Sequence, residues 1–247
     1  MAEIFDRRFY PEIGAGGFTR IDGTIPFYQR VNAVLKSSDI LLDYGAGRGV
    51  GHIEDVCEYR RSLRSFRTKA ARVIGVDVDE AVMLNPSLDE AHVFHPKDRL
   101  PLDDASIDVI VSDFTLEHIA DPLQTASELD RVLKPGGWLC ARTPNRHGYI
   151  ALANRVVPKA MTMRVLNVVQ PERKEEDVFP AMYQMNSFGR LLKLFPADRF
   201  EHFSYSFDSE PTYHANNKIL YKSMQIVHYL TPPALRSLLM VFIKKRL

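Results

Sequence analysis

The sequence has little cysteine, little net charge and no long apolar run. Only Cys57 and Cys140 occur among the 247 residues, too few for a disulfide framework, which favours a reducing compartment. The formal net charge of +1 gives no overall attraction to nucleic acid or to a bilayer. The run LLMVFI near the C-terminus is too short to span a membrane, and the N-terminus shows no apolar signal sequence. We therefore expect a cytoplasmic protein with no transmembrane segment that does not bind nucleic acid.

Short apolar runs alternate with helical patterns through the middle of the chain. The runs are continuous, as in parallel strands that are buried on both faces. Asp121 and Pro122 are a typical N-cap and first residue of a helix, which KPGG then ends. Strands that alternate with helices predict a doubly wound α/β fold, in which helices cover both faces of a mainly parallel sheet. The predicted strands are 39–45, 71–78, 91–96, 107–114 and 137–144.

The remaining elements follow from periodicity. Helices are predicted near 25–36 and 187–195, and residues 199–207 alternate with period two, as in a strand. Residues 237–245 form either a last strand or a helix; we favour the strand, and favour it also over a basic membrane contact by this segment. Two apolar stripes are predicted to pack on the sheet: Val56, Tyr59, Leu63 and Phe66 in a first helix, and Leu123, Ala126, Leu129, Val132 and Leu133 in the helix after Asp121.

The stretch DYGAGRG, residues 43–49, places glycines at every second position after a predicted strand. A P-loop would need Lys and Ser or Thr after the last glycine, where the chain has Val50 and Gly51. A dinucleotide fingerprint would need a different glycine spacing. Asp43 is poorly placed for a pyrophosphate but well placed for a cation, such as the ammonium group of a methionine moiety. A plain strand-to-helix turn is the alternative to such a ligand site.

Further motifs follow in order along the chain. Asp77 ends the second strand, where a carboxylate can accept both ribose hydroxyls of an adenosine ligand. After it come LP, SIDVIVS, LEH and LKPGG. With this ordered set, residues 39–145 resemble the class I S-adenosylmethionine-dependent methyltransferases, in particular the methyltransferase type 11 or ubiquinone- and menaquinone-biosynthesis-like group. The resemblance implies a Rossmann-like, seven-stranded sheet whose last strand is antiparallel.

The resemblance also implies one domain, S-adenosyl-L-methionine as cofactor, and no metal. Its parts would be a helical cap (1–38), a cofactor-binding core (39–147), a lid or substrate-side insertion (148–199) and C-terminal strands with a connecting helix (200–247). The methionine moiety would be lined by Asp43, Gly45, Ala46 and Gly47, with Gly45 closest to it. Asp77 and Val78 would hold the ribose and flank the adenine, and Asp98 and Arg99 would lie at the adenine rim. Asp113 and Phe114 would face the cofactor from the other side, with His118 behind.

The acceptor would approach beyond the fifth strand, where TPNRHGY follows. His147 is the first candidate for a general base and His118 the second, with an orienting role favoured for His118. Residues 182–188 form either a lid or a loop packed on the sheet, and the packed loop is favoured. The basic segment 58–72 favours a solvated helix face over a phosphate or RNA site. We expect methyl transfer to a small molecule or to a glycan or lipid precursor; the alternatives are a non-catalytic cofactor-binding or scaffold protein and an NAD-linked oxidoreductase.

Overall fold

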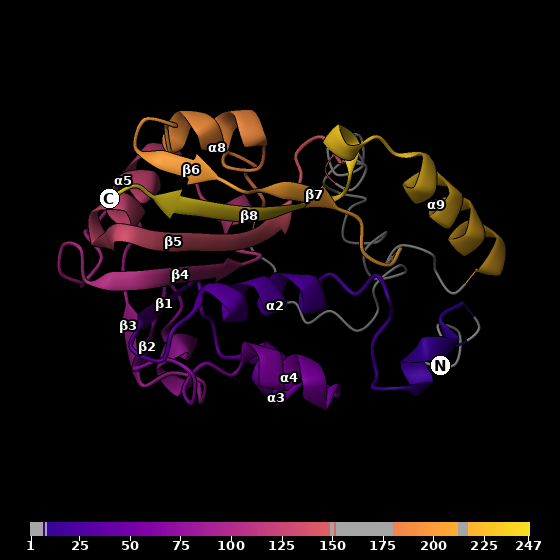
Figure 1. The fold of residues 1–247 in the computed structure, drawn as a ribbon, viewed down its shortest axis with the longest axis horizontal. Coiled ribbons are helices and arrows are strands. Elements are labelled where there is room, and N and C mark those ends of the chain that lie inside the picture. The colour runs from indigo at the N-terminus through magenta and orange to yellow at the C-terminus, as the bar shows by residue number, and fades with distance from the viewer. Residues whose placement is uncertain (1–6, 8, 149–150, 152–179, 212–216) are drawn as a thin grey trace.

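The computed structural model describes residues 7, 9–148, 151, 180–211 and 217–247. Residues 149–150 and 152–179, which make up most of the predicted lid, lie outside the described residues. The described chain folds around one sheet with the strand order β3-β2-β1-β4-β5-β8-β6, and β7 also pairs with β8 (Figure 1). The strands are β1 (Ile40–Tyr44), β2 (Arg72–Asp77), β3 (Glu90–Val93), β4 (Ile107–Asp113), β5 (Leu133–Pro144), β6 (Phe200–His202), β7 (Tyr205–Phe207) and β8 (Leu238–Lys245).

The strand directions match the sequence prediction. β1 to β5 are parallel, and β8 runs antiparallel to β5 over seven residue pairs, from Trp138↔Lys244 to Pro144↔Leu238. Because β1, β2 and β4 are neighbours and parallel, their carboxyl ends meet at one edge of the sheet. That edge is where ligands bind in open α/β folds, at the point where the strand order reverses.

Helices cover both faces of the sheet and create two separate cores (Figure 1). Successive residues of a strand point to opposite faces. Leu41 accordingly packs with the helices on one face and Leu42 with those on the other. One core contains α2 (Thr24–Val34) and α4 (Glu58–Arg64), and the other contains α5 (Pro122–Val132) and α8 (Phe188–Leu194). The other described helical elements are η1 (Pro11–Gly14), α3 (Val50–Ile53), η2 (Glu80–Leu84), η3 (Leu116–His118), α9 (Lys218–Leu230) and η5 (Pro233–Leu235).

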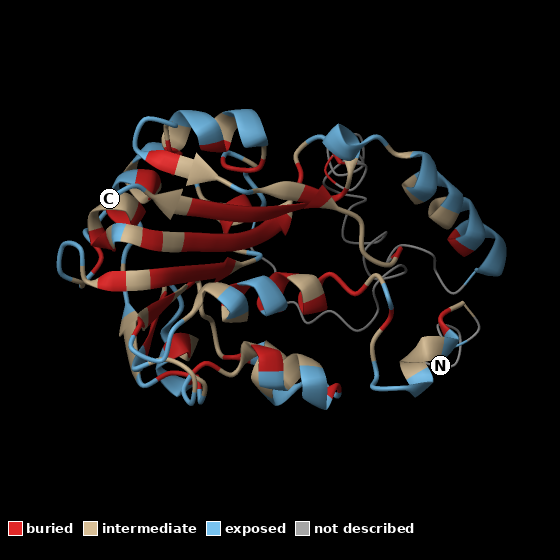
Figure 2. Ribbon diagram, viewed as in Figure 1, coloured by how far each residue is buried: buried red, intermediate tan, exposed pale blue. Residues whose placement is uncertain are grey.

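Strand β8 confirms the prediction of a strand over 237–245. The six apolar residues of LLMVFI are all buried, which Figure 2 shows as a red strand inside the sheet. The predicted strand 199–207 is interrupted instead of continuous. β6 and β7 each make three pairs with β8, and between them the backbone N–H of Phe203 bonds to the carbonyl of Phe242. The seventh position of the sheet is therefore filled by a broken strand.

The two predicted apolar stripes are only partly correct. Val56 precedes α4 and is exposed, and Tyr59 is also exposed, so only Leu63 and Phe66 of the first stripe are buried. The chain between β1 and β2 forms two short helices instead of one long helix, so Val56 lies outside α4. Tyr59 lies in the first turn of α4, where its ring contacts Phe18 and stays partly exposed. In α5 the Asp121 side chain caps Leu123 and Gln124 N–H as predicted, but Leu123 itself is exposed in the first turn.

Both cysteines are free and buried. Cys57 precedes α4, and its thiol donates a hydrogen bond to the Gly16 carbonyl. Cys140 lies inside β5, where burial raises the pKa of its thiol far above the usual range. Among the helices of the described residues, none has both the length and the apolar character needed to cross a membrane.

Candidate active site

Three aspartates mark the edge where β1, β2 and β4 end. Asp43 is the second-last residue of β1, and Asp77 and Asp113 are the last residues of β2 and β4. Burial, followed by the charges of Asp113 and Asp77, raises the pKa of Asp43 to about 7. Within the described part of the chain no group donates a hydrogen bond to Asp43 or lowers its pKa. A carboxylate in this position favours a cationic group beside it.

Gly45 and Gly47 follow β1 with left-handed backbones, at φ +80° and +50°. A Cβ on Gly45 would lie 2.2 Å from Oγ1 of Thr115, which follows β4. Gly45 is thus required by its backbone angle and by a protein side chain, a reason that differs from the predicted contact with the ligand. A Cβ on Gly47 would meet no atom within 4 Å. Gly47 is therefore the position at which a ligand can approach bare backbone.

Two side chains hold the glycine loop from the β2 side. The Asp77 carboxylate accepts hydrogen bonds from the backbone N–H of Gly47 at 2.8 Å and from that of Asp79 at 2.9 Å. Asn85, which is buried, donates to the carbonyls of Ala46 and Gly47, each at 3.0 Å. The sequence pointed to Asp77 but not to Asn85, since a lone Asn after a short helix carries no local signal. Asp77 is fixed in orientation, and each of its oxygens keeps capacity to accept from a hydroxyl.

Asp113 forms a bidentate ion pair with Arg142 of β5. Nε and Nη2 of Arg142 each lie 2.7 Å from a carboxylate oxygen, and Arg142 is buried. The Tyr28 hydroxyl of α2 donates to Asp113 at 3.0 Å, and Arg142 also donates to Thr24 at 3.0 Å. The charge of Asp113 is thus compensated by Arg142, and its carboxylate is held in place by protein groups. An arginine inside the apolar run 137–144 was the sequence signal for such a buried partner, and sequence reasoning missed it.

Phe114 marks the end of β4 with a strained backbone. Its φ is +56°, which is uncommon for a bulky residue, and the ring is partly exposed. The Arg142 guanidinium lies 4.8 Å from the centre of the ring, and the Phe114 N–H bonds to the Arg142 carbonyl at 2.8 Å. Strain of this kind is concentrated at ligand sites. It turns Phe114 out of the strand, beside the carboxylates.

Glu117 forms a second buried acidic centre, which sequence reasoning missed although the residue lies in the LEH motif. Its carboxylate accepts a hydrogen bond from Thr143 at 2.9 Å, and Thr143 accepts one from Asn186 at 2.6 Å. Burial is the main reason that the pKa of Glu117 rises to about 7. The Glu117 carbonyl accepts from the N–H groups of Met182 and Tyr183. These bonds tie the segment around 182–186 to the ends of β4 and β5.

That segment favours the packed-loop interpretation over a lid. Met185 and Asn186 are fully buried, and the Asn186 carbonyl accepts from the Arg146 N–H at 2.9 Å. His118 lies at the same junction, where Nδ1 is 3.1 Å from the Pro180 carbonyl. Because a carbonyl only accepts, Nδ1 carries the proton in this contact. This geometry supports the orienting role for His118.

The other predicted site residues lie further out. His147 is exposed in the turn after β5, where its N–H bonds to Oδ1 of Asn145. Val78 follows β2 and is partly exposed. Asp98 lies in the exposed turn after β3, and Arg99 pairs with Asp104 at 2.9 Å on the surface. Their contacts to a base or cofactor stay predictions.

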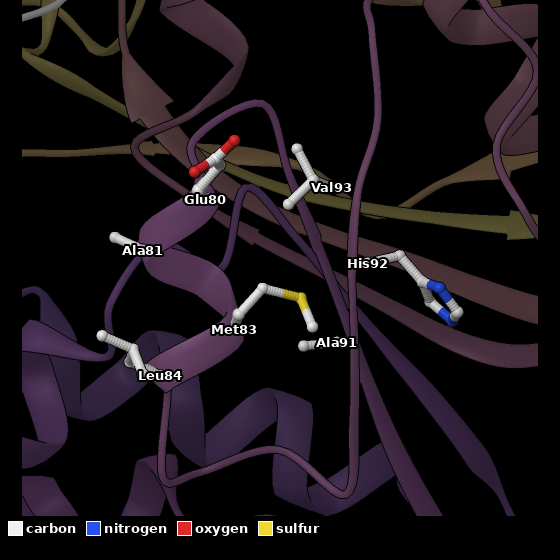
Figure 3. A pocket seen from close by; sticks show the side chains of 7 residues that line it. All are labelled: Glu80, Ala81, Met83, Leu84, Ala91, His92 and Val93. Atoms are coloured by element: carbon white, nitrogen blue, oxygen red, sulfur yellow. The ribbon is translucent and has the colours of Figure 1, made fainter.

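A shallow, mainly apolar hollow lies between η2 and the edge strand β3, and its lining includes Val93, the last residue of β3 (Figure 3). Met83 of η2 reaches toward Ala91 of β3, and Val93 and Leu84 also line the hollow (Figure 3). Glu80 is the only carboxylate in its lining. The hollow thus lacks the converging polar groups of a cofactor site, which the edge at β1, β2 and β4 provides.

The basic segment 58–72 is neutralised within the protein. Asp55 accepts hydrogen bonds from Arg60 and Arg64, each at 2.7 Å, and Arg60 also pairs with Asp22 at 2.8 Å. Arg67 pairs with Asp89 at 2.8 Å. These arginines hold the loop between β1 and β2 together, which leaves little of the positive charge free for a polyanion.

No group of three His, Cys, Asp or Glu side chains that could hold a metal ion occurs among the described residues. Asp43, Asp77 and Asp113 lie on neighbouring strands, but Asp113 is committed to Arg142 and Asp77 to backbone N–H groups. The strand-end edge instead combines an uncompensated carboxylate, an open glycine turn and an oriented aspartate. This combination fits a ligand that carries a cation at one end and hydroxyls at the other.

Comparison with known proteins agrees with this geometry. A family model described as a methyltransferase domain matches residues 20–206. A relative from Mycolicibacterium smegmatis, named "Probable S-adenosylmethionine-dependent methyltransferase", is 39% identical over 126 residues, which cover 48% of this chain and 43% of the relative. A relative of similar name from Mycobacterium tuberculosis H37Rv is 33% identical over 129 residues, covering 48% and 40%. The matched stretch is thus less than half the length of each relative.

Solved structures share the fold at low identity. The YcgJ protein from Bacillus subtilis matches with a TM-score of 0.54 and 14% identity, covering 90% of this chain and 98% of that protein. Geranyl diphosphate C-methyltransferase from Streptomyces coelicolor A3(2), solved with Mg²⁺, geranyl diphosphate and S-adenosyl-L-homocysteine, matches with a TM-score of 0.52 and 15% identity, covering 90% and 79%. At these identities the likeness establishes the fold.

The two glycines give a matched pair of variants. Gly47→Ala places a methyl group in open space at a cost of about 1–2 kcal/mol for the left-handed backbone, so the fold should survive. Its affinity for S-adenosylhomocysteine should fall by about tenfold or more, since the methyl group occupies the approach to the loop. Gly45→Ala collides with Thr115 and should mainly lower the free energy of unfolding. Calorimetry and urea denaturation measure both effects; unchanged affinity in folded Gly47→Ala would contradict the assignment.

Glu117 predicts a pH-dependent stability. Its folded-state pKa of about 7 lies above the ordinary value of 4.5. The protonated form is therefore favoured by folding, and stability decreases as the pH rises from the ordinary value through the folded pKa. Glu117→Gln keeps an acceptor for Thr143 but cannot ionise. Between pH 5 and pH 8, the free energy of unfolding of the variant should therefore rise by about 2–3 kcal/mol relative to that of the native chain.

Urea denaturation of both proteins at pH 5 and pH 8 measures this gain. The titration of Asp43 occurs in both proteins and cancels in the difference. If the free energies of unfolding of the two proteins differ by the same amount at pH 5 and pH 8, Glu117 ionises in the folded state as readily as in the unfolded chain.

Proposed function

Because the chain belongs to the S-adenosylmethionine-dependent methyltransferases, we propose that it transfers the methyl group of S-adenosylmethionine to a small molecule or to a glycan or lipid precursor. The cofactor supplies an electrophilic methyl group on a sulfonium. An aspartate at the end of β2 is also compatible with NAD, and membership of this family favours S-adenosylmethionine over NAD as the cofactor. Since the chain matches less than half of its curated relatives, the activity and the acceptor are inferred from the site.

The observation that carries the proposal is the uncompensated carboxylate of Asp43. A group with a strongly raised pKa beside an open glycine turn is typical of a functional site, because such an arrangement costs stability. The ammonium and sulfonium groups of the cofactor are both cations, and either would restore the ionised form of Asp43. Gly47 leaves bare backbone for the methionine moiety, and Asp77 presents a fixed carboxylate to the ribose hydroxyls.

The residues around the acceptor position would orient it and limit its contact with water. Phe114 contributes a partly exposed ring, and the segment around 182–186 is tied down beside it through Glu117 and Asn186. Alignment of the reacting atoms supplies much of the rate in a direct displacement. If the acceptor loses a proton, His147 is our candidate base, because it is exposed in the turn after β5.

The affinity for S-adenosylhomocysteine should depend on pH through Asp43. The free carboxyl has a pKa of about 7, and binding of an ammonium group favours its ionised form. Below pH 7 binding must therefore release a proton, so the affinity should be about tenfold lower at pH 6 than at pH 8. Asp43→Asn should bind weakly and nearly equally at both values. Calorimetry at both pH values tests this; equal affinities in the native chain would remove Asp43 from the site.

Turnover separates the enzyme from a non-catalytic binder of the same fold. The protein is incubated with S-adenosylmethionine carrying a labelled methyl group and with separate fractions of small molecules, glycans, lipids, proteins and RNA. Label should enter one of the first three fractions, and Gly47→Ala should reduce the incorporation. Label in protein or RNA alone would contradict the proposed acceptor class. Cofactor binding without any incorporation would favour the scaffold alternative.

A further inference from the structure

Helix α9 stands apart from the sheet, beyond the ends toward which β4 and β5 point (Figure 1). It belongs to the connection between β7 and β8, and it contacts the N-terminal segment. Tyr221 is buried, its ring centre 4.3 Å from that of Phe9, and Gln225 donates to the Tyr10 hydroxyl at 3.1 Å. One side of α9 is thus covered by the N-terminal segment.

The opposite side of α9 is apolar and exposed. Ile219, Ile226, Val227 and Leu230 are spaced i, i+7, i+8 and i+11, which places them on one helical face. They are exposed by 78, 60, 52 and 70%, and Figure 2 shows most of the helix in pale blue. We call these four residues the outer face of α9. Single exposed apolar residues are ordinary, but a row of large ones along a helix marks an interaction site.

The charge around the outer face has one sign. Lys218 and Lys222 lie on α9 and are exposed, and the sequence has no Asp or Glu from position 211 to the C-terminus. The acids just before this stretch are engaged elsewhere. Asp208 accepts from the N–H and hydroxyl of Ser237, and Glu210 accepts from Thr19. The outer face therefore offers apolar surface with Lys222 at its border, and among the described residues no carboxylate forms an ion pair with that lysine.

We propose that the outer face of α9 binds the surface of an anionic lipid bilayer. A helix of 13 residues is about 20 Å long and can lie in the plane of the interface with its apolar side among the acyl chains. Lys222 at the border can extend to the headgroups, and the exposed Tyr229 suits the same depth. A second copy of the chain fits less well, because a symmetric contact would bring two surfaces with the same positive border together.

The attachment of this connection would bring the strand-end edge toward the bilayer. The Asn145 side chain, directly after β5, donates to the carbonyls of Ala234 and Arg236 at 3.0 and 2.8 Å. The connection is thus fixed to the end of the strand from which the predicted acceptor region begins. The inference goes beyond the proposed function and does not depend on the identity of the acceptor.

Vesicle flotation tests the proposal on the full chain. The protein is mixed with vesicles of phosphatidylcholine, with and without phosphatidylglycerol. It should float with the anionic vesicles and much less with the neutral ones. Ile226→Asp and Lys222→Glu should each reduce the bound fraction by about fivefold or more, through lost apolar burial and lost attraction to the headgroups. Leu123→Asp, an exposed apolar residue of α5 far from α9, is the matched control and should bind like the native chain.

Two measurements without vesicles complete the test. The variants should keep the melting temperature and the S-adenosylhomocysteine affinity of the native chain, so a loss of flotation cannot be assigned to unfolding or to the cofactor site. Absence of flotation, or equal flotation of the α9 variants and the control, would overturn the proposal. A lowered melting temperature in Ile226→Asp would show that the chain itself covers the outer face. A dimer in sedimentation that Ile226→Asp dissociates would show that a second copy does.

Discussion

The bidentate ion pair between Arg142 and Asp113 is the interaction on which the strand-end edge depends. It joins the ends of β4 and β5, and through Tyr28 and Thr24 it fixes α2 against the same edge. Breaking a buried pair by removing one partner typically costs about 3–5 kcal/mol, because a charge is left uncompensated. With Asp113 neutralised by protein, Asp43 is the carboxylate that remains for a ligand. The protein thus separates a structural aspartate from a binding aspartate on adjacent strands.

The edge also carries a cost that packing alone does not explain. The pKa values of Asp43 and Glu117 are both raised to about 7, which means that the folded protein stabilises the ionised form of each carboxyl group poorly. A bound cation relieves Asp43, but the Glu117 carboxylate is held only weakly, by the Thr143 hydroxyl and its own backbone N–H. Carboxylates kept under such conditions are typical of sites whose chemistry needs them. We interpret Glu117 as part of the acceptor side, where it also fixes the segment around 182–186.

Sequence patterns predicted the fold well because burial on both faces of a parallel strand leaves a continuous apolar run. The same patterns failed where local geometry decides. Val56 fits the same helical face as Leu63 only if the helix extends back to it, and the chain instead breaks before α4, where Asp55 pairs with Arg60 and Arg64. The aspartates at strand ends could be recognised because position alone defines them. Asn85 and Asn186 could not, since each bonds to a partner many residues away along the chain, Asn85 to the glycine loop and Asn186 to Thr143 of β5.

The composition also concealed the local electrostatics. A net charge of +1 is the sum of an acidic edge and basic segments that face other directions. The arginines between β1 and β2 are paired with carboxylates, so they contribute structure and little external field. Among the described residues no carboxylate pairs with Lys218 or Lys222 of α9, and Lys222 borders an apolar face. Positive charge thus remains free on the one described helix that stands beyond the strand ends. The Asn145 side chain anchors the connection between β7 and β8 at the end of β5, while α9 itself extends away from the sheet. The positive charge of α9 is therefore kept apart from the site that we propose binds a cation.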